Sequence, residues 1–562
     1  MVHTRKVRTG HLAAVGLAAL LVLSGCAESQ RSQNDPNASG GAAKTGGTMT
    51  FATEGAPKLF DPFFATDGAT FRTSQQIFEG LVEFKPGTAE AGPGLAEKWT
   101  STPDGKQWTF TLRKGAKFHD GTEFDAEAAC QNFNRWYNQK GAGQSTAVTG
   151  YWQDNFGGFS DGAKPSLYKS CAVKDPQTVV VELTSYTSKF PDILGLPSFA
   201  MQSPAAMKQH DADNVVKQGD SFVYPAYGQQ HPSGTGPFKF SKYDKANGTV
   251  ELVRNDDYWG PKTFLDKLIL RAIPDETARK QALQSGDVQG YDLPSPADWE
   301  QLKKDGHKLL IRPAFNVMYI GIGQKSNEKL RDLRVRQAIA HAIDREGLVK
   351  QQYPEGAKVA ENLYPDTIFG WTGDVRKYDY NPDKAKSLLA EAGASGLAVT
   401  IYWPTEVSRP YMPSPRDIFG FVRGNLEAVG LKLNVVSKPW NGGYLEDVDQ
   451  AKADVFLLGW NGDYNTPDNF IGNFFADPDN RFATGSATWG NQLSAEVKAA
   501  DAEPDTAKRK AMYEALNKKL KAEYLPAVPV AHSPPALVTS AKVSGLVPSP
   551  LTDERFNAVS LG

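Results

Sequence analysis

The stretch Asp454-Val455-Phe456-Leu457-Leu458-Gly459-Trp460-Asn461-Gly462-Asp463-Tyr464-Asn465-Thr466-Pro467-Asp468-Asn469-Phe470 changes character halfway along its length. It begins as a short apolar run, which is typical of a buried strand. It continues with Gly, Asn, Asp and Pro, residues that turn a chain or let its backbone approach a ligand. Asp463 follows the predicted strand, with Trp460 and Tyr464 close by. Two interpretations stay open: a strand exit whose aromatic rings are core, or a binding loop that presents one carboxylate between aromatic walls.

Helix and strand patterns alternate around this stretch in the C-terminal half. Asp332 is placed to cap a helix whose apolar residues Val335, Ile339, Ala342 and Ile343 share one face. Asn381-Pro382 opens another helix, which ends before Gly393, and an apolar stripe from Ile418 to Val429 ends before Gly430. Leu431 to Val436 then alternates as a strand. Interleaved helices and strands predict an α/β domain with an at least partly parallel sheet.

Length and composition set the outer limits. A chain of 562 residues is too long for one core, since about 150 residues make a typical compact unit. With 40% apolar and 22% charged residues it has the composition of a globular protein. Its 11 Trp, 20 Tyr and 29 Phe suit cores and also ligand clefts.

The N-terminus has the pattern of a targeting segment. Arg5, Lys6 and Arg8 precede an apolar run from Leu12 to Leu23, which is too short to span a bilayer. The run ends in Leu23-Ser24-Gly25-Cys26, which resembles the lipobox of bacterial lipoproteins. We therefore expect residues 1–26 to be a signal peptide, with cleavage leaving a lipidated Cys26. The acyl chains would anchor an exported protein to the outer face of the cell membrane.

Residues 27–47 lack large apolar side chains and are expected to be a flexible tether with a reach of roughly 25 Å. Without the first 26 residues the chain has 59 Lys and Arg against 64 Asp and Glu, a net charge of −5. This balance, with no basic tract, excludes nucleic acid as an expected partner.

Cys130 and Cys171 are the other two cysteines. An exported compartment permits a disulfide between them, but the sequence leaves open whether their sulfurs meet. His119 beside Asp120 could suggest proton transfer. With no nucleophile motif nearby, we interpret these two residues as part of a structural turn.

Several blocks together resemble one known family. Pro93 to Trp99 and Thr109 to Gly121 are similar to the signature of the bacterial extracellular solute-binding proteins that serve peptide and nickel ABC importers. The similarity resumes in five further blocks: Gly234–Phe238, Asn255–Gly260, Ile273–Asp275, Val335–Ile339 and Tyr380–Lys386. Their order and spread over nearly the whole chain make the resemblance specific.

The resemblance implies an α/β fold of two lobes, the class II-like periplasmic-binding-protein fold, with a subdomain inserted in the first lobe. The first lobe would comprise residues 48–313 and 535–562, with the inserted subdomain at about 83–224, and the second lobe residues 314–534. Ligands of such folds lie in the cleft between lobes, which close by a hinge.

A short peptide is a zwitterion, and each buried end needs a partner of opposite charge. Gly459 to Asp463 is similar to the turn of peptide-binding members whose Asp takes the ligand's ammonium, which points to Asp463 in preference to Asp468. Ser408 to Arg416 resembles the Arg-Pro-Tyr-x-Pro stretch whose first Arg receives the ligand's carboxylate, which points to Arg409 in preference to Arg416. Fixing both ends predicts a preference for dipeptides, since each further residue adds about 3.3–3.6 Å.

Further ligand contacts are expected from Trp460, Gly462, Tyr464, Gly68, Thr70 and Trp403. The loop from Thr66 to Phe71 stands where family members pair their backbone with the ligand. It departs from the family pattern by carrying Asp67, which puts the side-chain preference in doubt. Trp403 and Trp440 fit a cleft wall and fit a core equally well.

Taken together, the sequence predicts a lipid-anchored monomer that captures short peptides and passes them to the permease of an ABC importer. The same fold also serves longer oligopeptides, haem, nickel complexes and oligosaccharides, so these ligands stay open. A secreted hydrolase is the alternative of another class, but no catalytic motif supports an enzyme. The scattered histidines predict no metal site, and no cofactor is expected.

Overall fold

The computed structural model describes residues 45–219 and 221–562. The predicted signal peptide, the lipidation residue Cys26 and tether residues 27–44 lie outside the described residues. At the end of the predicted tether, Gly46 donates a backbone hydrogen bond to Phe264 O (2.7 Å) and Gly47 donates to Asp266 Oδ2 (2.8 Å). These two glycines are therefore already bonded to the folded body.

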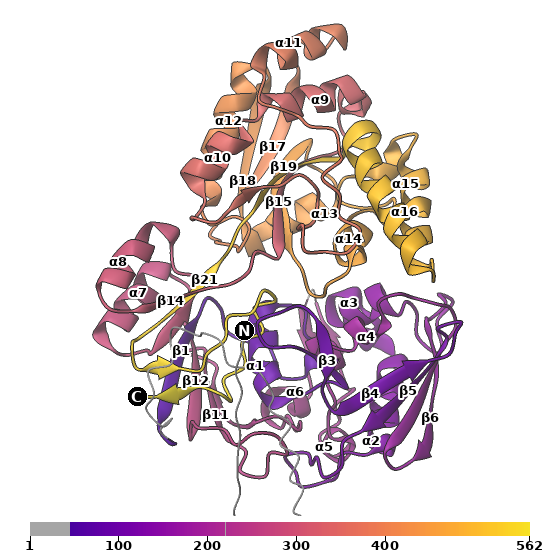
Figure 1. Ribbon diagram of the computed structural model, residues 1–562, viewed down its shortest axis with the longest axis vertical. Helices are drawn as coiled ribbons and strands as arrows, with labels where there is room; N and C mark the ends of the chain where they lie inside the picture. Colours follow the sequence, from indigo (N-terminus) through magenta and orange to yellow (C-terminus); the bar gives the residue numbers. More distant parts are fainter. Residues whose placement is uncertain (1–44, 220) are drawn as a thin grey trace, which may run out of the picture. The chain divides into compact units, whose positions relative to one another are not determined.

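Two large sheets organise the described chain (Figure 1). The first sheet has seven strands in the order β10-β11-β12-β1-β13-β21-β14 among the described residues. They span Phe238–Asp244, Thr249–Arg254, Lys267–Ala272, Thr48–Thr53, Gly290–Asp292, Ala536–Thr539 and Lys308–Ile311, respectively. Strand β1 is parallel to β12 and β13, and the other pairs are antiparallel. Helices α1 (Gly68–Ile77), α7 (Glu276–Ser285) and α8 (Trp299–Lys304) belong to this part.

A smaller sheet lies between α1 and β10 in the sequence. Its described strands, in the order β4-β5-β7-β6, span Ala96–Ser101, Gln107–Leu112, Thr178–Leu183 and Tyr168–Asp175. The accompanying helices are α2 (Ala126–Tyr137), α3 (Thr146–Asn155), α4 (Phe190–Ile193), α5 (Pro204–Gln209) and α6 (Ala226–Gln230). Two hairpins, β2–β3 (Val82–Phe84 and Ala91–Pro93) and β8–β9 (Val216–Gln218 and Ser221–Val223), complete it. This separate sheet supports the predicted inserted subdomain.

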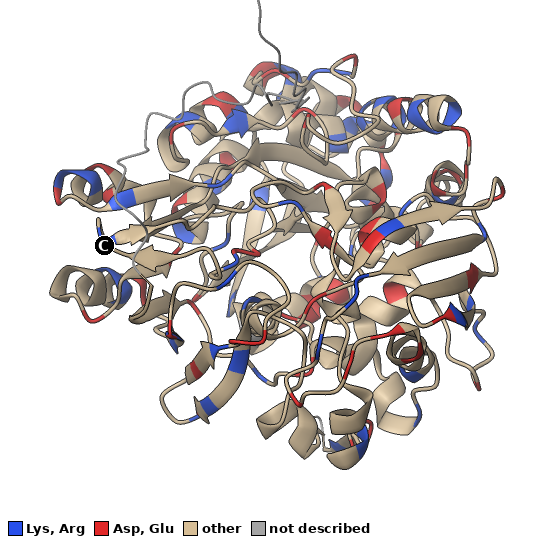
Figure 2. Cartoon of the chain, turned by 60° about the horizontal axis from the view of Figure 1, so that its bottom comes forward, with Lys and Arg blue, Asp and Glu red and all other residues tan. Residues whose placement is uncertain are grey.

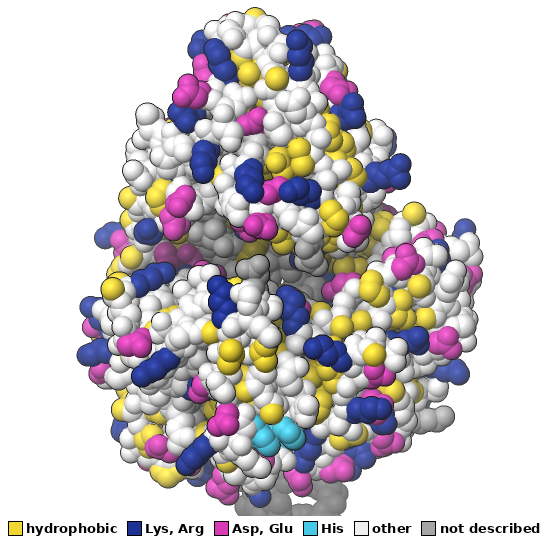
Figure 3. All heavy atoms as spheres, turned by 180° about the vertical axis from the view of Figure 1, so that it is seen from behind, with side chains coloured by type: hydrophobic (Ala, Val, Ile, Leu, Met, Phe, Trp, Pro, Cys, Tyr) yellow, Lys and Arg dark blue, Asp and Glu magenta, His cyan; other side chains and the backbone are white. Residues whose placement is uncertain are grey.

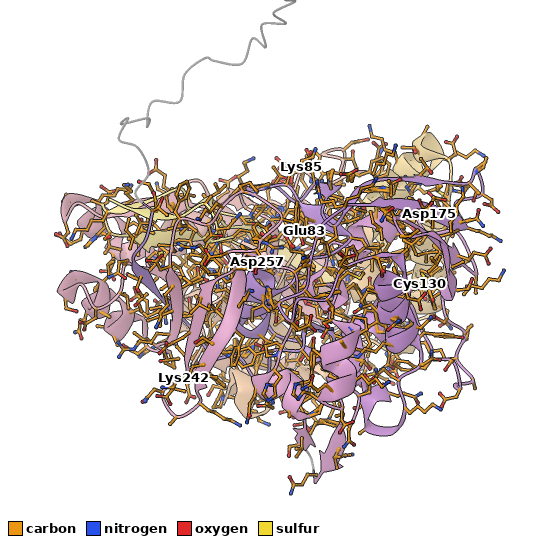
Figure 4. The ribbon with its side chains drawn as sticks, turned by 90° about the horizontal axis from the view of Figure 1, so that it is seen from below. Glu83, Lys85, Cys130, Asp175, Lys242 and Asp257 are labelled. Atoms are coloured by element: carbon orange, nitrogen blue, oxygen red, sulfur yellow. A yellow bond between two sulfur atoms is a disulfide. The ribbon has the colours of Figure 1, made fainter. Side chains whose placement is uncertain are left out.

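Cys130 and Cys171 form a disulfide that joins α2 to β6. Figure 4 shows Cys130 on its helix in the same part of the molecule as Asp175, the last residue of β6. The sequence could not show whether these two cysteines are paired, and the structure shows that they are.

The second large sheet is the scaffold of the opening stretch. Its strands, in the order β16-β20-β15-β19-β17-β18 within the described chain, span Lys358–Val359, Ala527–His532, Asn316–Ile322, Val455–Asn461, Ala398–Thr405 and Lys432–Pro439. Strand β17 is parallel to β18 and to β19, whereas β15 is antiparallel to β19 and β20. The prediction of an α/β fold with a partly parallel sheet is therefore confirmed.

Helices cover both faces of the second sheet (Figure 1). One face packs on α9 (Leu333–Ala342), α10 (Arg345–Gln352), α11 (Pro382–Glu391) and α12 (Pro415–Ala428). The other packs on α13 (Leu445–Asp449), α14 (Ile471–Phe475), α15 (Gly490–Asp501) and α16 (Thr506–Lys519). Asp332 caps α9 by accepting from Arg334 N, and Asn381 caps α11 by accepting from Lys384 N, as their sequence positions predict.

The chain crosses from the first sheet to the second between β14 and β15, and returns between β20 and β21. The predicted crossings near 313 and 534 fall in these two connections. Asn316, the first residue of β15 after one connection, bonds Ser533 in the other: its Nδ2 donates to Ser533 O (2.7 Å) and its Oδ1 accepts from Ser533 N (3.0 Å). The two crossings therefore share one hydrogen-bonded junction. The bounds of the two lobes and of the inserted subdomain are a proposal that this arrangement supports.

Four charged side chains lie buried beside the junction. Arg312 bonds Asp292 (2.7 Å) and Glu554 (2.6 Å), and Arg72 of α1 bonds the same two carboxylates. Each of these side chains is at most 3% exposed. Two cations and two anions thus balance one another where the chain leaves the first sheet, and we call them the buried quartet.

Acidic and basic residues are interspersed over the fold (Figure 2). In the parts of the chain that the structure describes, no helix has the length and apolar character needed to cross a membrane.

Candidate ligand-binding site

The two loops that carry the predicted charges leave the second sheet at the same edge. Strands β17 and β19 are adjacent and parallel, so their carboxyl ends lie side by side. Arg409 follows β17, and Asp463 follows β19. The antiparallel strand β15 begins at this edge with Asn316, opposite Asn461. Ligands of open α/β sheets bind beyond the carboxyl ends of parallel strands. The topology therefore places Arg409 and Asp463 where a ligand site is expected, next to the chain crossings.

The carboxylate of Asp463 has no cationic partner among the residues that the structure describes. Its backbone N–H donates to Asn469 Oδ1 (2.7 Å), and Asn469 Nδ2 lies 3.4 Å from its Oδ2. Within residues 45–219 and 221–562, no Lys or Arg forms an ion pair with it. Burial raises the pKa of Asp463 to about 7, with Asp154 adding to the rise and the Asn469 hydrogen bond opposing it. An isolated carboxylate in this place gains most from a ligand that brings a positive charge.

Asp468, the rival carboxylate, is already neutralised. Lys189, at the start of α4, forms an ion pair with it, and both side chains are largely buried, at 11% and 13% exposure. Tyr464 Oη also donates to Asp468 (3.1 Å). A ligand ammonium would therefore compete with Lys189 at Asp468, but not at Asp463.

Arg409 lies in a tight turn after β17, closed by hydrogen bonds in both directions with Met412 (3.1 and 2.9 Å). Its guanidinium carbon lies 5.0 Å from the centroid of the Trp440 ring, a cation–π distance. Its Nε is buried without a hydrogen-bond partner in the described chain. Arg409 also lines a crevice with the second crossing, which includes Ser533, Pro534 and Pro535. Arg416, the alternative cation, is exposed in the first turn of α12.

Three residues of the opening stretch have internal partners. Trp460 Nε1 lies 3.3 Å from Asn469 Oδ1. Gly462 donates its N–H to Phe315 O (2.8 Å), and a side chain there would collide with the rings of Phe315 and Phe470. Tyr464 is 4% exposed. The structure thus shows packing roles for these residues, and their ligand contacts stay predictions.

In the loop before α1, the polar side chains are also hydrogen-bonded to nearby residues. Asp67 is the N-cap of α1, accepting from Thr70 N (3.0 Å) and Thr70 Oγ1 (3.0 Å). Thr70 Oγ1 also accepts from Lys58 N (3.1 Å). The hydroxyl of Thr70 is therefore engaged in the cap, whereas Gly68 is exposed with open space around it. The departure from the family pattern at Asp67 has a helix-capping explanation.

Trp403 packs flat against Phe419 of α12, with ring centroids 5.0 Å apart and an interplanar angle of 6°. This contact favours the core interpretation of Trp403. Trp440, left undecided by the sequence, stacks on the buried Tyr444, with ring centroids 5.8 Å apart, and also packs against Arg409.

Sequence reasoning missed two residues beside Asp463. Asn469 holds the loop by contacts of its side-chain oxygen with Asp463 N and Trp460 Nε1. Asn469 follows Pro467 by two residues, and this turn pattern could have indicated its role from the sequence. Tyr151 of α3 packs edge-on against Phe71 (5.2 Å), and burial raises its pKa, with Asp463, Asp154 and Asp67 adding to the rise. Helix α3 thus faces the Asp463 loop from the first-sheet side.

Seen from behind, the surface is hollowed between the upper part, which holds the second sheet, and the lower part (Figure 3). No group of three or more His, Cys, Asp or Glu in the described residues is arranged to hold a metal ion.

The architecture is the two-lobed α/β fold of periplasmic binding proteins. Residues 90–482 match the family model described as bacterial extracellular solute-binding proteins, family 5 Middle, and the chain belongs to this family.

Known relatives cover nearly the whole chain. A dipeptide-binding protein of Escherichia coli (strain K12) is 32% identical over 92% of this chain and 94% of the relative. Heme-binding protein A of Haemophilus influenzae is 29% identical over 97% and 98%. The crystal structure of a dipeptide-binding protein from Pseudoalteromonas sp. SM9913 in complex with Met-Leu has a TM-score of 0.77 and 25% identity, over 92% of this chain and 100% of that one.

Proposed function

We propose that this protein captures short peptides, dipeptides above all, and delivers them to the membrane permease of an ABC importer. The observation that carries this proposal is that Asp463 and Arg409, on loops that leave adjacent parallel strands at one sheet edge, form no ion pair within the described residues. One end of a zwitterion would meet each charge. The similarity to dipeptide-binding proteins supports the same ligand class.

In this function Asp463 takes the peptide's ammonium, and Arg409 takes its carboxylate with two parallel hydrogen bonds. Neighbouring strands are about 4.8 Å apart, and two extended residues span about 7 Å. The two charged loops leave strands that are immediate neighbours, and this closeness favours a ligand as short as a dipeptide over longer chains. The protein then needs to perform no chemistry on its ligand.

Calorimetry with Ala-Ala, Ala-Ala-Ala, N-acetyl-Ala-Ala and Ala-Ala-amide tests the assignment. We expect the first peptide to bind best and the two blocked peptides to lose most of the affinity, because each lacks one terminal charge. Equal binding of the acetylated peptide would overturn the role of Asp463, and equal binding of the amide would overturn that of Arg409.

The lipid anchor at Cys26, the monomeric state and the outer-face location complete the proposal. Mass spectrometry of the N-terminal peptide after expression in a bacterial host tests the anchor. A diacyl or triacyl mass on Cys26 is expected, and an unmodified Cys26 would contradict it.

A further inference from the structure

The segment Tyr186 to Lys189 links the small sheet to the loops and helices of the second sheet. Ser188 Oγ donates to Asp501 of α15 (3.1 Å), and Thr187 Oγ1 lies 3.5 Å from the same carboxylate. Tyr186 Oη accepts from Arg509 of α16 (2.9 Å). With the Lys189–Asp468 pair included, four consecutive residues make polar contacts with residues that lie about 280 to 320 positions away in the sequence.

Thr187 and Lys189 are both nearly enclosed, at 4% and 9% exposure. Lys189 is followed by Phe190, a fully buried residue of the hydrophobic cluster around the small sheet. Burial opposes its charge, but Asp468, Asp501 and Asp154 outweigh that effect and raise the pKa of Lys189. The lysine is thus a fixed cation among three carboxylates.

Asp468 lies five residues after Asp463, in the same loop. Tyr464, between them, packs into the cluster of the small sheet, with its hydroxyl bonded to Asp468 (3.1 Å) and 3.4 Å from Asn155 Oδ1 of α3. The placement of the Asp463 loop therefore depends on the bonds that hold Asp468. The negative charge of Asp468 is neutralised by Lys189, which belongs to the segment Tyr186 to Lys189.

We propose that Lys189 is a positioning residue for ligand binding. It neutralises Asp468, leaving Asp463 to take the ligand's ammonium, and it holds the 186–189 segment against the Asp463 loop. A ligand with a single positive charge is then favoured over one with two. This inference rests on the proposed peptide-binding function.

The test compares two substitutions that break the same pair with opposite changes in charge. Lys189→Met leaves Asp468 as a second free anion, so Ala-Ala should bind about tenfold more weakly than to wild type, while Lys-Ala gains relative to Ala-Ala by about tenfold. Asp468→Asn removes the anion instead, so the wild-type preference for Ala-Ala over Lys-Ala should persist. A purely structural contact would alter both variants alike. Lys189→Arg should restore wild-type behaviour, and Lys169→Met, which breaks an exposed pair with Glu182 on the small sheet, is the matched control.

Hydrogen exchange of the ligand-free protein supplies a readout that needs no peptide. Amides of residues 186–190 should exchange faster in Lys189→Met and at the wild-type rate in Lys169→Met. Unchanged exchange with an unchanged Lys-Ala to Ala-Ala ratio would overturn the inference while leaving the proposed function intact. Faster exchange in a protein whose wild type binds neither dipeptide would overturn the proposed function and support the contact.

Discussion

The buried quartet and the Asp463–Arg409 pair lie beside the same chain crossings but treat charge in opposite ways. In the quartet, Arg72 and Arg312 each contact both Asp292 and Glu554. At the sheet edge, Asp463 has a raised pKa, and the Nε of Arg409 is buried without a partner among the described residues. The quartet matches its charges within the protein, whereas Asp463 and Arg409 form no ion pair among the described residues, which fits their proposed role in meeting the charges of a ligand.

Arg312→Met should have the largest effect on stability. It leaves Asp292 and Glu554 with one arginine between them, so the free energy of unfolding should fall by about 3–5 kcal/mol in urea titrations. Arg334→Met, which breaks the exposed pair with Asp332, should change it by less than about 1 kcal/mol. Similar effects from the two substitutions would contradict the comparison.

Asp463→Asn should weaken peptide binding but make the ligand-free protein more stable, whereas Arg312→Met makes the protein less stable. Affinity for Ala-Ala should fall by about 100-fold in calorimetry, because the peptide's ammonium loses its counter-charge. The ligand-free protein should become more stable at about pH 8, by on the order of 1–2 kcal/mol. The folded-state pKa of about 7 exceeds the unfolded value, so the ionised carboxylate destabilises the fold increasingly as pH rises from about 4 to above 7. A variant that loses stability at this pH would refute the interpretation of Asp463 as an unmatched charge.

Arg409→Met tests the other end of the site. Ala-Ala should bind about 30-fold more weakly, since a charge-assisted bidentate contact is lost. Ala-Ala-amide should bind the variant and the wild type with similar affinity, because it brings no carboxylate. An equal loss of affinity for both peptides would point to a packing role on Trp440 instead.

The affinity of the wild type should depend on pH through Asp463. Ionised Asp463 is needed to pair with the ammonium, so the dissociation constant should rise roughly tenfold as pH falls from about 7.5 to about 6. Above about pH 8 it should rise again, as the peptide's own amine loses its proton. The acidic limb should be absent in Asp463→Asn; its persistence there would assign it to another group.

Asp67→Ala should have the smallest effect. Loss of the N-cap of α1 should lower the free energy of unfolding by about 1 kcal/mol, and Asp67→Ser should retain most of it. Peptide affinity should change by less than about threefold, because Asp67 serves Thr70 within the cap. A larger loss of affinity would show that Asp67 faces the ligand directly.

Local patterns made much of the fold predictable. Asp332 and Asn381 cap the helices that their positions predict. Gly248, with a φ of +57°, lies in the loop of residues 245–248 between β10 and β11. His119 and Asp120 lie in a turn: His119 Nε2 contacts Gly236 O, and Asp120 accepts from Thr122 and Ser203. These features depend on neighbours in the sequence or on one strong local preference.

The contacts that shape the site depend on residues far apart in the chain, which single-sequence patterns do not pair. Lys189 meets Asp468 across 279 positions, and neither local sequence signals the other. The family block that contains Tyr258 and Trp259 is a similar case. Both side chains donate to Glu79, at 2.7 and 2.8 Å, so this block serves a buried carboxylate and not the ligand loops. The resemblance to the family identified this block in the sequence, but only the fold shows that its side chains bind Glu79.

The hydrogen-bonded junction between Asn316 and Ser533 bears on how a membrane permease could distinguish the ligand-bound protein from the ligand-free one. Because the two chain crossings are hydrogen-bonded to each other at one place, we expect that place to be the hinge if the two sheets move relative to one another. In such a motion the distance between the far rims would change with ligand binding, and a permease could respond to that distance without contacting the ligand.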